Sequence, residues 1–196
     1  MYLPPMDMQS IAGEYQLQAV HEMASAFLLK PEGDFQFFFS YGALDRYGSG
    51  KWILQNDVLI LNSAEKPEHD FELIESKTIP GDQITVRITD RNSTLLRYVY
   101  ASLQKEETAS WQPANNEGLA EFPKQEIKDI SLMFEFCQEK TSTFIDIDKQ
   151  HNHFTFRFKP WFAEVFIKNF VLKSEKDGLT GGHPLLNGNQ FLYARL

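Results

Sequence analysis

Disulfides, basic clusters and long apolar runs are all missing from this sequence. Its single cysteine, Cys137, excludes an intramolecular disulfide. Lys and Arg number 19 against 27 Asp and Glu and form no block, so phosphate contacts to a nucleic acid have little electrostatic support. No stretch approaches the roughly 18 consecutive apolar residues that a membrane span needs. We therefore expect neither a nucleic-acid partner nor a membrane span.

A targeting signal is missing as well. Residues 1–15 have no basic region followed by an apolar stretch, which a secretory signal requires. The sequence as written predicts a cytoplasmic protein, and the periplasm or cell envelope of a bacterium is the alternative if a leader has been removed. The net charge of -8 favours solubility and does not indicate an oligomeric state.

The motifs of common catalytic and cofactor sites do not occur. The sequence has no Gly-x-Ser-x-Gly nucleophile motif, no Gly-x-Gly-x-x-Gly motif and no P-loop. Cys137 ends a strand-like run and has no adjacent base in the sequence, which is typical of a buried, inert thiol. We therefore predict no catalytic residue and no cofactor.

His151 and His153 come nearest to a metal site. Two histidines at positions i and i+2 of a strand share a face and can chelate an ion, and Asp146 and Asp148 are close in the sequence. However, residues 148–153 have the composition of a polar hairpin turn, and no third ligand follows at a fixed spacing. We interpret the histidines as part of a solvated turn and predict no metal site.

Aromatic residues are abundant, with 17 Phe, and this favours an all-β protein. The run from Phe27 to Ser63 consists of apolar stretches separated by turn residues. Pro31 and Gly33 predict a first turn, because proline presets φ and glycine accepts a positive φ. Residues 47–50 predict a second turn, and Asn56-Asp57 predicts a two-residue hairpin.

The stretch after the first turn is a strand with two distinct faces. Strict alternation places Phe35, Phe37 and Phe39 on one face and Phe38 on the other. Later in the chain, residues 161–172 fit the period of a helix or of a strand. Their aromatic and β-branched content favours a long strand.

The number of expected strands predicts the architecture. The first 80 residues supply about six, near residues 13–19, 24–30, 34–41, 50–54, 57–62 and 70–75, and the tail supplies about two more. Eight strands close a small antiparallel barrel, whereas six would leave two unpaired edges. We therefore predict a discontinuous barrel domain of residues 1–80 plus 160–196, with residues 82–158 inserted as a β-sandwich.

The inserted stretch resembles a known family. The order Val86-x-Ile88-x-Asp90, a turn, and then Asn115–Phe122 is similar to the carboxypeptidase-regulatory-like or transthyretin-like β-sandwich domains. Ser93 stands where that family prefers glycine. The resemblance implies a seven-stranded sandwich that acts as a non-catalytic accessory or contact module.

The barrel part resembles the lipocalins. Gly13-x-Tyr15 and Gly50-x-Trp52 match the glycine-x-aromatic strand starts of that family, and Arg195 matches a basic residue that caps the tryptophan of the barrel. The resemblance implies a closed barrel in which Arg195 stacks on Trp52.

Tyr41, Asp45, Arg46 and Tyr47 are the candidate ligand-binding residues. Tyrosines beside a charged pair in a loop can line a ligand mouth, although a turn-stabilising Asp and surface tyrosines explain the pattern equally well. We expect a non-enzymatic binding protein that contacts a partner protein or a surface polymer. The alternative is a lipocalin-type carrier of a small apolar ligand, but the many Phe residues predict a filled barrel.

Overall fold

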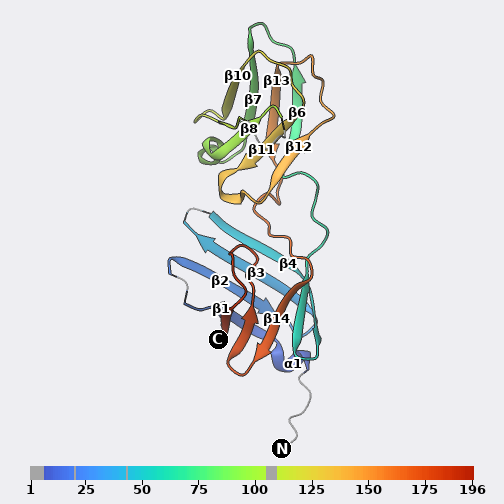
Figure 1. Cartoon of the computed structure of the whole chain (residues 1–196), viewed down its shortest axis with the longest axis vertical. Coiled ribbons are helices and arrows are strands. Elements are labelled where there is room, and N and C mark those ends of the chain that lie inside the picture. Colours follow the sequence, from blue (N-terminus) through green and yellow to red (C-terminus); the bar gives the residue numbers. More distant parts are fainter. Residues whose placement is uncertain (1–6, 20, 43, 105–109) are drawn as a thin grey trace, which may run out of the picture. The chain divides into compact units, whose positions relative to one another are not determined.

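The computed structural model describes residues 7–19, 21–42, 44–104 and 110–196, and these form an almost entirely β protein (Figure 1). The all-β class that the aromatic content predicted is therefore confirmed. The chain divides into two compact units. The barrel unit consists of Met1–Lys66 and Ala163–Leu196, and the inserted unit consists of Pro67–Phe162.

Eight strands of the barrel unit close into an antiparallel barrel, as predicted. Their order around the barrel is β1-β16-β15-β14-β5-β4-β3-β2. In chain order they are β1 (Gly13–Leu17), β2 (Met23–Leu29), β3 (Asp34–Tyr41), β4 (Leu44–Gln55), β5 (Val58–Asn62), β14 (Phe170–Glu175), β15 (Gly178–Gly181) and β16 (Phe191–Arg195). A short helix, α1 (Met8–Ile11), precedes β1. Figure 1 shows the red strand β14 in the same unit as the blue and cyan strands β1 to β4.

The origin of the barrel strands differs from the prediction. The barrel takes five strands from the first part of the chain and three from the last, instead of six and two. The strand expected at residues 70–75 exists as β6 (Phe71–Lys77), but it pairs with β13 (His153–Phe158) of the inserted unit. The extra tail strand is β15, whose two glycines gave it the composition of a turn.

Large inward-facing side chains fill the barrel. Phe35, Phe37 and Phe39 point inward, as their alternation predicted. The ring of Phe27 lies 5.0 Å from that of Phe37 and 5.2 Å from that of Tyr193. The largest fully buried side chains of this unit are Trp52, Tyr193, Phe27, Phe35, Phe37, Leu29, Leu59 and Leu61. Burying each such side chain stabilises the fold by about 1.5–3 kcal/mol, so this interior is the main source of barrel stability.

Two of the predicted turns are confirmed by their backbone geometry. Gly33 has a φ of +86°, and its amide donates a hydrogen bond of 3.0 Å to the carbonyl of Lys30. Asn56 and Asp57, between β4 and β5, have φ values of +49° and +65°. A type I′ hairpin turn requires a positive φ at both central residues, and Asn and Asp tolerate it better than most residues.

The turn predicted at residues 47–50 is wrong, because these residues lie within the long strand β4. The two glycines allow another backbone to approach closely, and the chain does not change direction at them. A Cβ atom on Gly48 would lie 2.6 Å from the carbonyl oxygen of Val165, and one on Gly50 would collide with the carbonyl of Asn62. Glycine inside a strand often marks such a close approach of another backbone.

The long strand predicted at residues 161–172 is also wrong. β14 begins only at residue 170, and the chain before it is irregular. Val165 N donates to Tyr47 O at 2.7 Å, and Ser63 N donates to Ile167 O at 2.7 Å. Residues 163–167 thus bind along the part of β4 that extends beyond its pairing with β5. We call residues 163–169 the return segment.

Arg195 joins β16 to α1, but it does not stack on Trp52 as the lipocalin resemblance implied. Its guanidinium donates to the carbonyls of Ser10 and Ala12 at 2.8 and 2.7 Å and lies 6.0 Å from the ring of Tyr15. The indole N–H of Trp52 donates instead to the carbonyl of Lys30 at 3.0 Å.

The inserted unit contains two four-stranded sheets, with orders β10-β7-β13-β6 and β12-β11-β8-β9. The remaining strands are β7 (Gln83–Thr89), β8 (Val99–Ser102), β9 (Gln112–Pro113), β10 (Leu119–Pro123), β11 (Ile130–Phe134) and β12 (Thr141–Phe144). Two short 3₁₀ helices cover Ser93–Tyr98 and Glu135–Cys137. All pairs are antiparallel except β7 with β13, which is parallel.

Aromatic side chains join the two sheets into a sandwich. The ring of Phe134 lies 5.3 Å from that of Phe158, and the ring of Phe144 lies 4.8 Å from that of Phe156. Stacked sheets usually lie about 10 Å apart, a gap that facing aromatic rings can fill. The described strands number eight, against the seven that the resemblance implied.

A buried ion pair holds together the two ends of the inserted unit. The ammonium of Lys140 donates to the carboxylate of Asp70 at 2.9 Å and to the carbonyls of Phe162 at 2.9 Å and Trp161 at 3.3 Å. Lys159 N also donates to Asp70 O at 2.9 Å. The start of β6 and the chain after β13 therefore lie side by side.

The division into independently folding domains remains a prediction, and a deletion tests it. We expect a chain with residues 67–162 replaced by a short Gly-Ser linker to fold as a barrel, because the hydrogen-bonded Ser63 and Ile167 lie close to the two ends that are joined. Circular dichroism and a cooperative urea transition measure this. The same chain without β16 is the control and should not fold. A deletion chain that stays unfolded while the full chain is stable contradicts the division.

Gly50→Ala should destabilise the barrel, because its Cβ atom would meet the backbone of β5, which cannot rotate away. Overpacking of this kind costs about 1–3 kcal/mol of unfolding free energy. Gly182→Ala is the matched control, since its Cβ atom would have no neighbour nearer than 3.6 Å. Urea denaturation of both variants measures the difference, and equal stabilities would disprove the close-approach role of Gly50.

Candidate functional site

The four predicted ligand-binding residues do not gather in one loop. β3 ends at Tyr41 and β4 begins at Leu44, so Asp45, Arg46 and Tyr47 belong to a strand. Since successive side chains point to opposite faces, Asp45 and Tyr47 face outward, whereas Arg46 points into the barrel and is 4% exposed. Tyr41 and Tyr47 are 54% and 48% exposed. The strand thus separates Arg46 from the others, and a binding role for the four residues remains a prediction.

A hollow of about 560 Å³ lies on the outer surface of the barrel, over β1 to β4. Three large apolar side chains in it are exposed to solvent: Leu28 by 36%, Phe38 by 43% and Tyr47 by 48%. We call these three residues, together with Ala26, the outer apolar face. The rest of the hollow is lined by Glu14, Gln36, Phe37, Gly48 and Ser49. Contiguous exposed apolar side chains with a polar rim are typical of an interaction site.

Strand register brings the outer apolar face together. Phe38 on β3 pairs with Ala26 on β2 and with Tyr47 on β4, while Leu28 pairs with Gln36 two residues along. Directly paired residues have Cβ atoms about 4.5–5.5 Å apart, so their side chains touch. The alternation of the Phe residues had placed Phe38 on the outer side, but the sequence contains no signal for its neighbours on the adjacent strands.

The barrel interior contains one buried histidine. The Nδ1 atom of His183 accepts hydrogen bonds from the amides of Leu185 and Leu186 at 3.0 and 3.1 Å, so its Nε2 atom carries the proton and donates to Ser25 Oγ at 3.0 Å. The rings of Phe37 and Phe39 lie 5.6 and 5.3 Å away. Burial lowers the pKa of His183 to about 4. Both nitrogens are engaged, which indicates a structural role.

Tyr193 is the second polar group of the interior, and it is also engaged. Its hydroxyl donates to the carbonyl of Gly182 at 2.9 Å. Burial raises the pKa of Tyr193, so the phenol stays neutral. Together with His183, it anchors the connection between β15 and β16 to the filled interior.

The histidines near residue 150 do not form a metal site in the part of the chain that the structure describes. His151 Nδ1 lies 2.9 Å from Ser76 Oγ, and His153 Nε2 lies 3.4 Å from Thr155 Oγ1. Burial, then the charge of Lys77, lowers the pKa of His153. Cys137 is buried at the end of a 3₁₀ helix, instead of in the expected strand.

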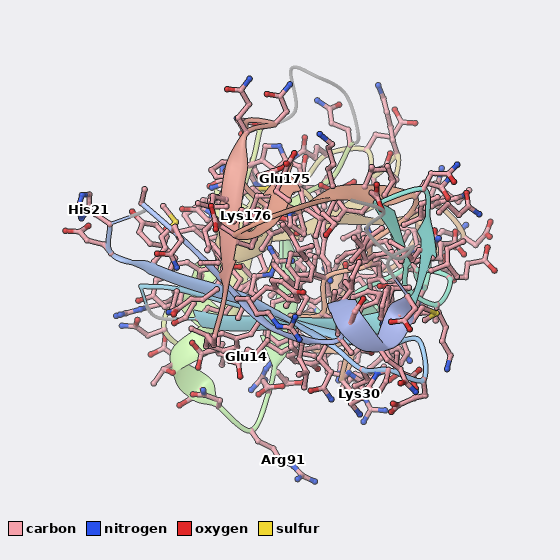
Figure 2. The ribbon with its side chains drawn as sticks, turned by 90° about the horizontal axis from the view of Figure 1, so that it is seen from below. Glu14, His21, Lys30, Arg91, Glu175 and Lys176 are labelled. Atoms are coloured by element: carbon pink, nitrogen blue, oxygen red, sulfur yellow. The ribbon has the colours of Figure 1, made fainter. Side chains whose placement is uncertain are left out.

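A second, more polar hollow of about 690 Å³ lies on the inserted unit. Glu72 bridges two cations within it, with 2.7 Å to Arg157 Nη2 and 3.2 Å to Lys159 Nζ. Hydrogen bonds from Arg157 and Lys159 hold the pKa of Glu72 below its usual value. Arg91, also in the lining, projects away from the ribbon (Figure 2). Glu72, Arg157 and Lys159 satisfy one another's charges, so this hollow is a weaker candidate than the outer apolar face.

Comparisons with protein-family models, with curated proteins and with solved structures found no match. Among the described residues, no helix is both long and apolar enough to cross a membrane.

The buried His183 predicts a dependence of stability on pH. Its pKa is about 4 in the folded state and 6.5 in the unfolded state, so only the unfolded chain binds a proton between these values. The stabilising contribution is complete above pH 6.5 and is lost as the pH falls to 4. We expect this loss to be about 2–3 kcal/mol.

Urea denaturation between pH 7 and 4 measures this effect. His183→Asn keeps an acceptor for the two amides and should flatten the pH profile by that amount. His21→Asn is the control, because His21 is exposed and projects away from the ribbon (Figure 2). If His183→Asn leaves the profile unchanged, His183 titrates normally in the folded protein and its burial has no energetic effect.

Proposed function

We propose that this chain is a non-enzymatic binding protein that contacts a partner protein or a surface polymer through the outer apolar face. The supporting observation is the exposure of Leu28, Phe38 and Tyr47 at adjacent positions of one sheet. Exposing such side chains to water is unfavourable, by about 25 cal/mol per Å² of apolar surface. A partner that covers the face removes this cost. The stability of the barrel is already accounted for by the inward-facing side chains of the same strands.

The packed interior favours a binding protein that uses its outer surface over the alternative, a lipocalin-type carrier of a small apolar ligand. A carrier needs space inside the barrel for its ligand. Here the interior contains Trp52, Tyr193 and Phe27, all less than 2% exposed, and the rings of Phe27 and Tyr193 lie 5.2 Å apart. The closed eight-stranded barrel agrees with the lipocalin resemblance, but the different contact of Arg195 weakens it.

The inserted unit is proposed to be an accessory contact module of the transthyretin-like kind. Its two facing sheets support this assignment. Beyond the seven strands that the resemblance implies, the unit has an eighth strand and one parallel pair, β7 with β13. The first and last described strands of the unit lie in the same sheet, which suits a module inserted into another fold.

Affinity capture with the full chain as bait tests the proposal. We expect the wild type to retain a reproducible partner, and the double variant Phe38→Ser, Tyr47→Ser to recover at least about tenfold less, since central aromatic residues dominate binding energy. Ile53→Ser is the matched control, because Ile53 is 46% exposed on β4 but lies outside the hollow. Equal recovery by all three chains contradicts the proposal.

Native mass spectrometry of freshly purified protein tests the carrier alternative. A retained small apolar ligand would favour the carrier, and its absence would agree with a filled barrel. The measurement needs no knowledge of the partner, so it separates the two functions even if the capture finds several proteins.

A further inference from the structure

The surroundings of the outer apolar face carry negative charge. The charged side chains that face outward on β1 to β4 are Glu14, Asp34, Asp45 and Lys51. Lys51 forms an ion pair with Asp34, which neutralises both. Neither Glu14 nor Asp45 has an ion-pair partner in the described part of the chain. Two uncompensated carboxylates therefore remain.

These two carboxylates lie on opposite sides of the outer apolar face. Glu14 is on β1, in the row that contains Leu28. Asp45 is on β4, two residues from Tyr47 and on the same face. Three strand spacings of about 4.8 Å and four residues of about 3.3 Å separate them, which gives a surface distance of about 20 Å. An extended chain of about six residues spans this distance.

We infer that the outer apolar face binds an extended peptide segment with an apolar centre and a cationic residue toward each end. This inference rests on the proposed function and specifies its partner. Alternate side chains of an extended segment point the same way, so two or three of them can contact Leu28, Phe38 and Tyr47. The small side chain of Ala26 lines the hollow that receives them. Lysine or arginine beyond the apolar centre then reaches Glu14 and Asp45.

The same charges disfavour other occupants. In a symmetric dimer formed through this face, the acidic positions of one copy would lie against the same acidic surface of the other, and like charges destabilise such a contact. An anionic membrane surface would be repelled for the same reason. A cationic segment gains from both carboxylates, and charged rims chiefly raise the association rate and the specificity.

Selection of random displayed peptides of about ten residues on the immobilised full chain tests the inference, because this length exceeds the span of the face. We expect the enriched peptides to combine apolar residues at alternate positions with Lys or Arg on both sides. Synthetic copies should bind more weakly as salt increases, since exposed charge pairs are screened.

Variants of the protein locate the binding. Glu14→Gln with Asp45→Asn should weaken a selected peptide about three- to tenfold, as expected for two exposed charge pairs. Phe38→Ser with Tyr47→Ser should abolish its binding. The charge control is Glu175→Gln with Asp177→Asn, which removes two carboxylates near the turn between β14 and β15 and should change nothing. Circular dichroism confirms that each variant is folded.

The possible outcomes separate the inference from the proposed function. Selected peptides that are acidic or neutral, yet lose binding with Phe38→Ser and Tyr47→Ser, overturn the inference and leave the proposed function standing. Selected peptides whose binding is unchanged by all of these substitutions overturn the inference, and so does a selection without enrichment. The capture experiment then decides the function by itself. Self-association of the wild type that depends on Phe38 would identify a second copy as the occupant and also overturn it.

Discussion

The buried contact between Lys140 and Asp70 holds the two ends of the inserted unit together. Each ion is almost fully buried, and the remaining donors of the ammonium bind the carbonyls of Trp161 and Phe162. Removing one partner of such a pair typically costs about 3–5 kcal/mol, because the other charge stays buried and uncompensated. The pair therefore keeps the two ends of the inserted unit side by side. In the barrel unit, Ser63 and Ile167 are joined in the same way by a hydrogen bond.

Barrel closure limits where this protein can bind anything. A closed sheet has no free edge, so a partner cannot extend the barrel by adding a strand. Its interior is occupied by aromatic side chains, and the return segment lies along the exposed part of β4. The outward side chains remain. Several of them are apolar and exposed, among them Ile53 and Val171, but Leu28, Phe38 and Tyr47 together line a hollow.

The sequence predicted those features of the fold that depend on local physics. Alternation identified the inward Phe residues of β3, and the residues at Asn56 and Asp57 identified a hairpin, because both signals come from neighbouring positions. The glycines at positions 48 and 50 were misread as a turn. Their function is to admit the backbones of the return segment and of β5, and one of these arrives from more than 100 residues later in the chain. A contact of that separation leaves no local pattern.

The same reasoning explains why the candidate site was only partly predictable. Tyr47 was selected for its place beside charged residues, and it does lie on the outer apolar face, but Arg46 next to it points into the barrel. Alternation alone would have separated them if the start of β4 had been known. The sequence could not show that Leu28 and Phe38 lie beside Tyr47, because a shift of one residue in strand register would reverse which side chains face outward. Register is set here by the filled interior, so the core that stabilises the barrel also arranges its outer surface.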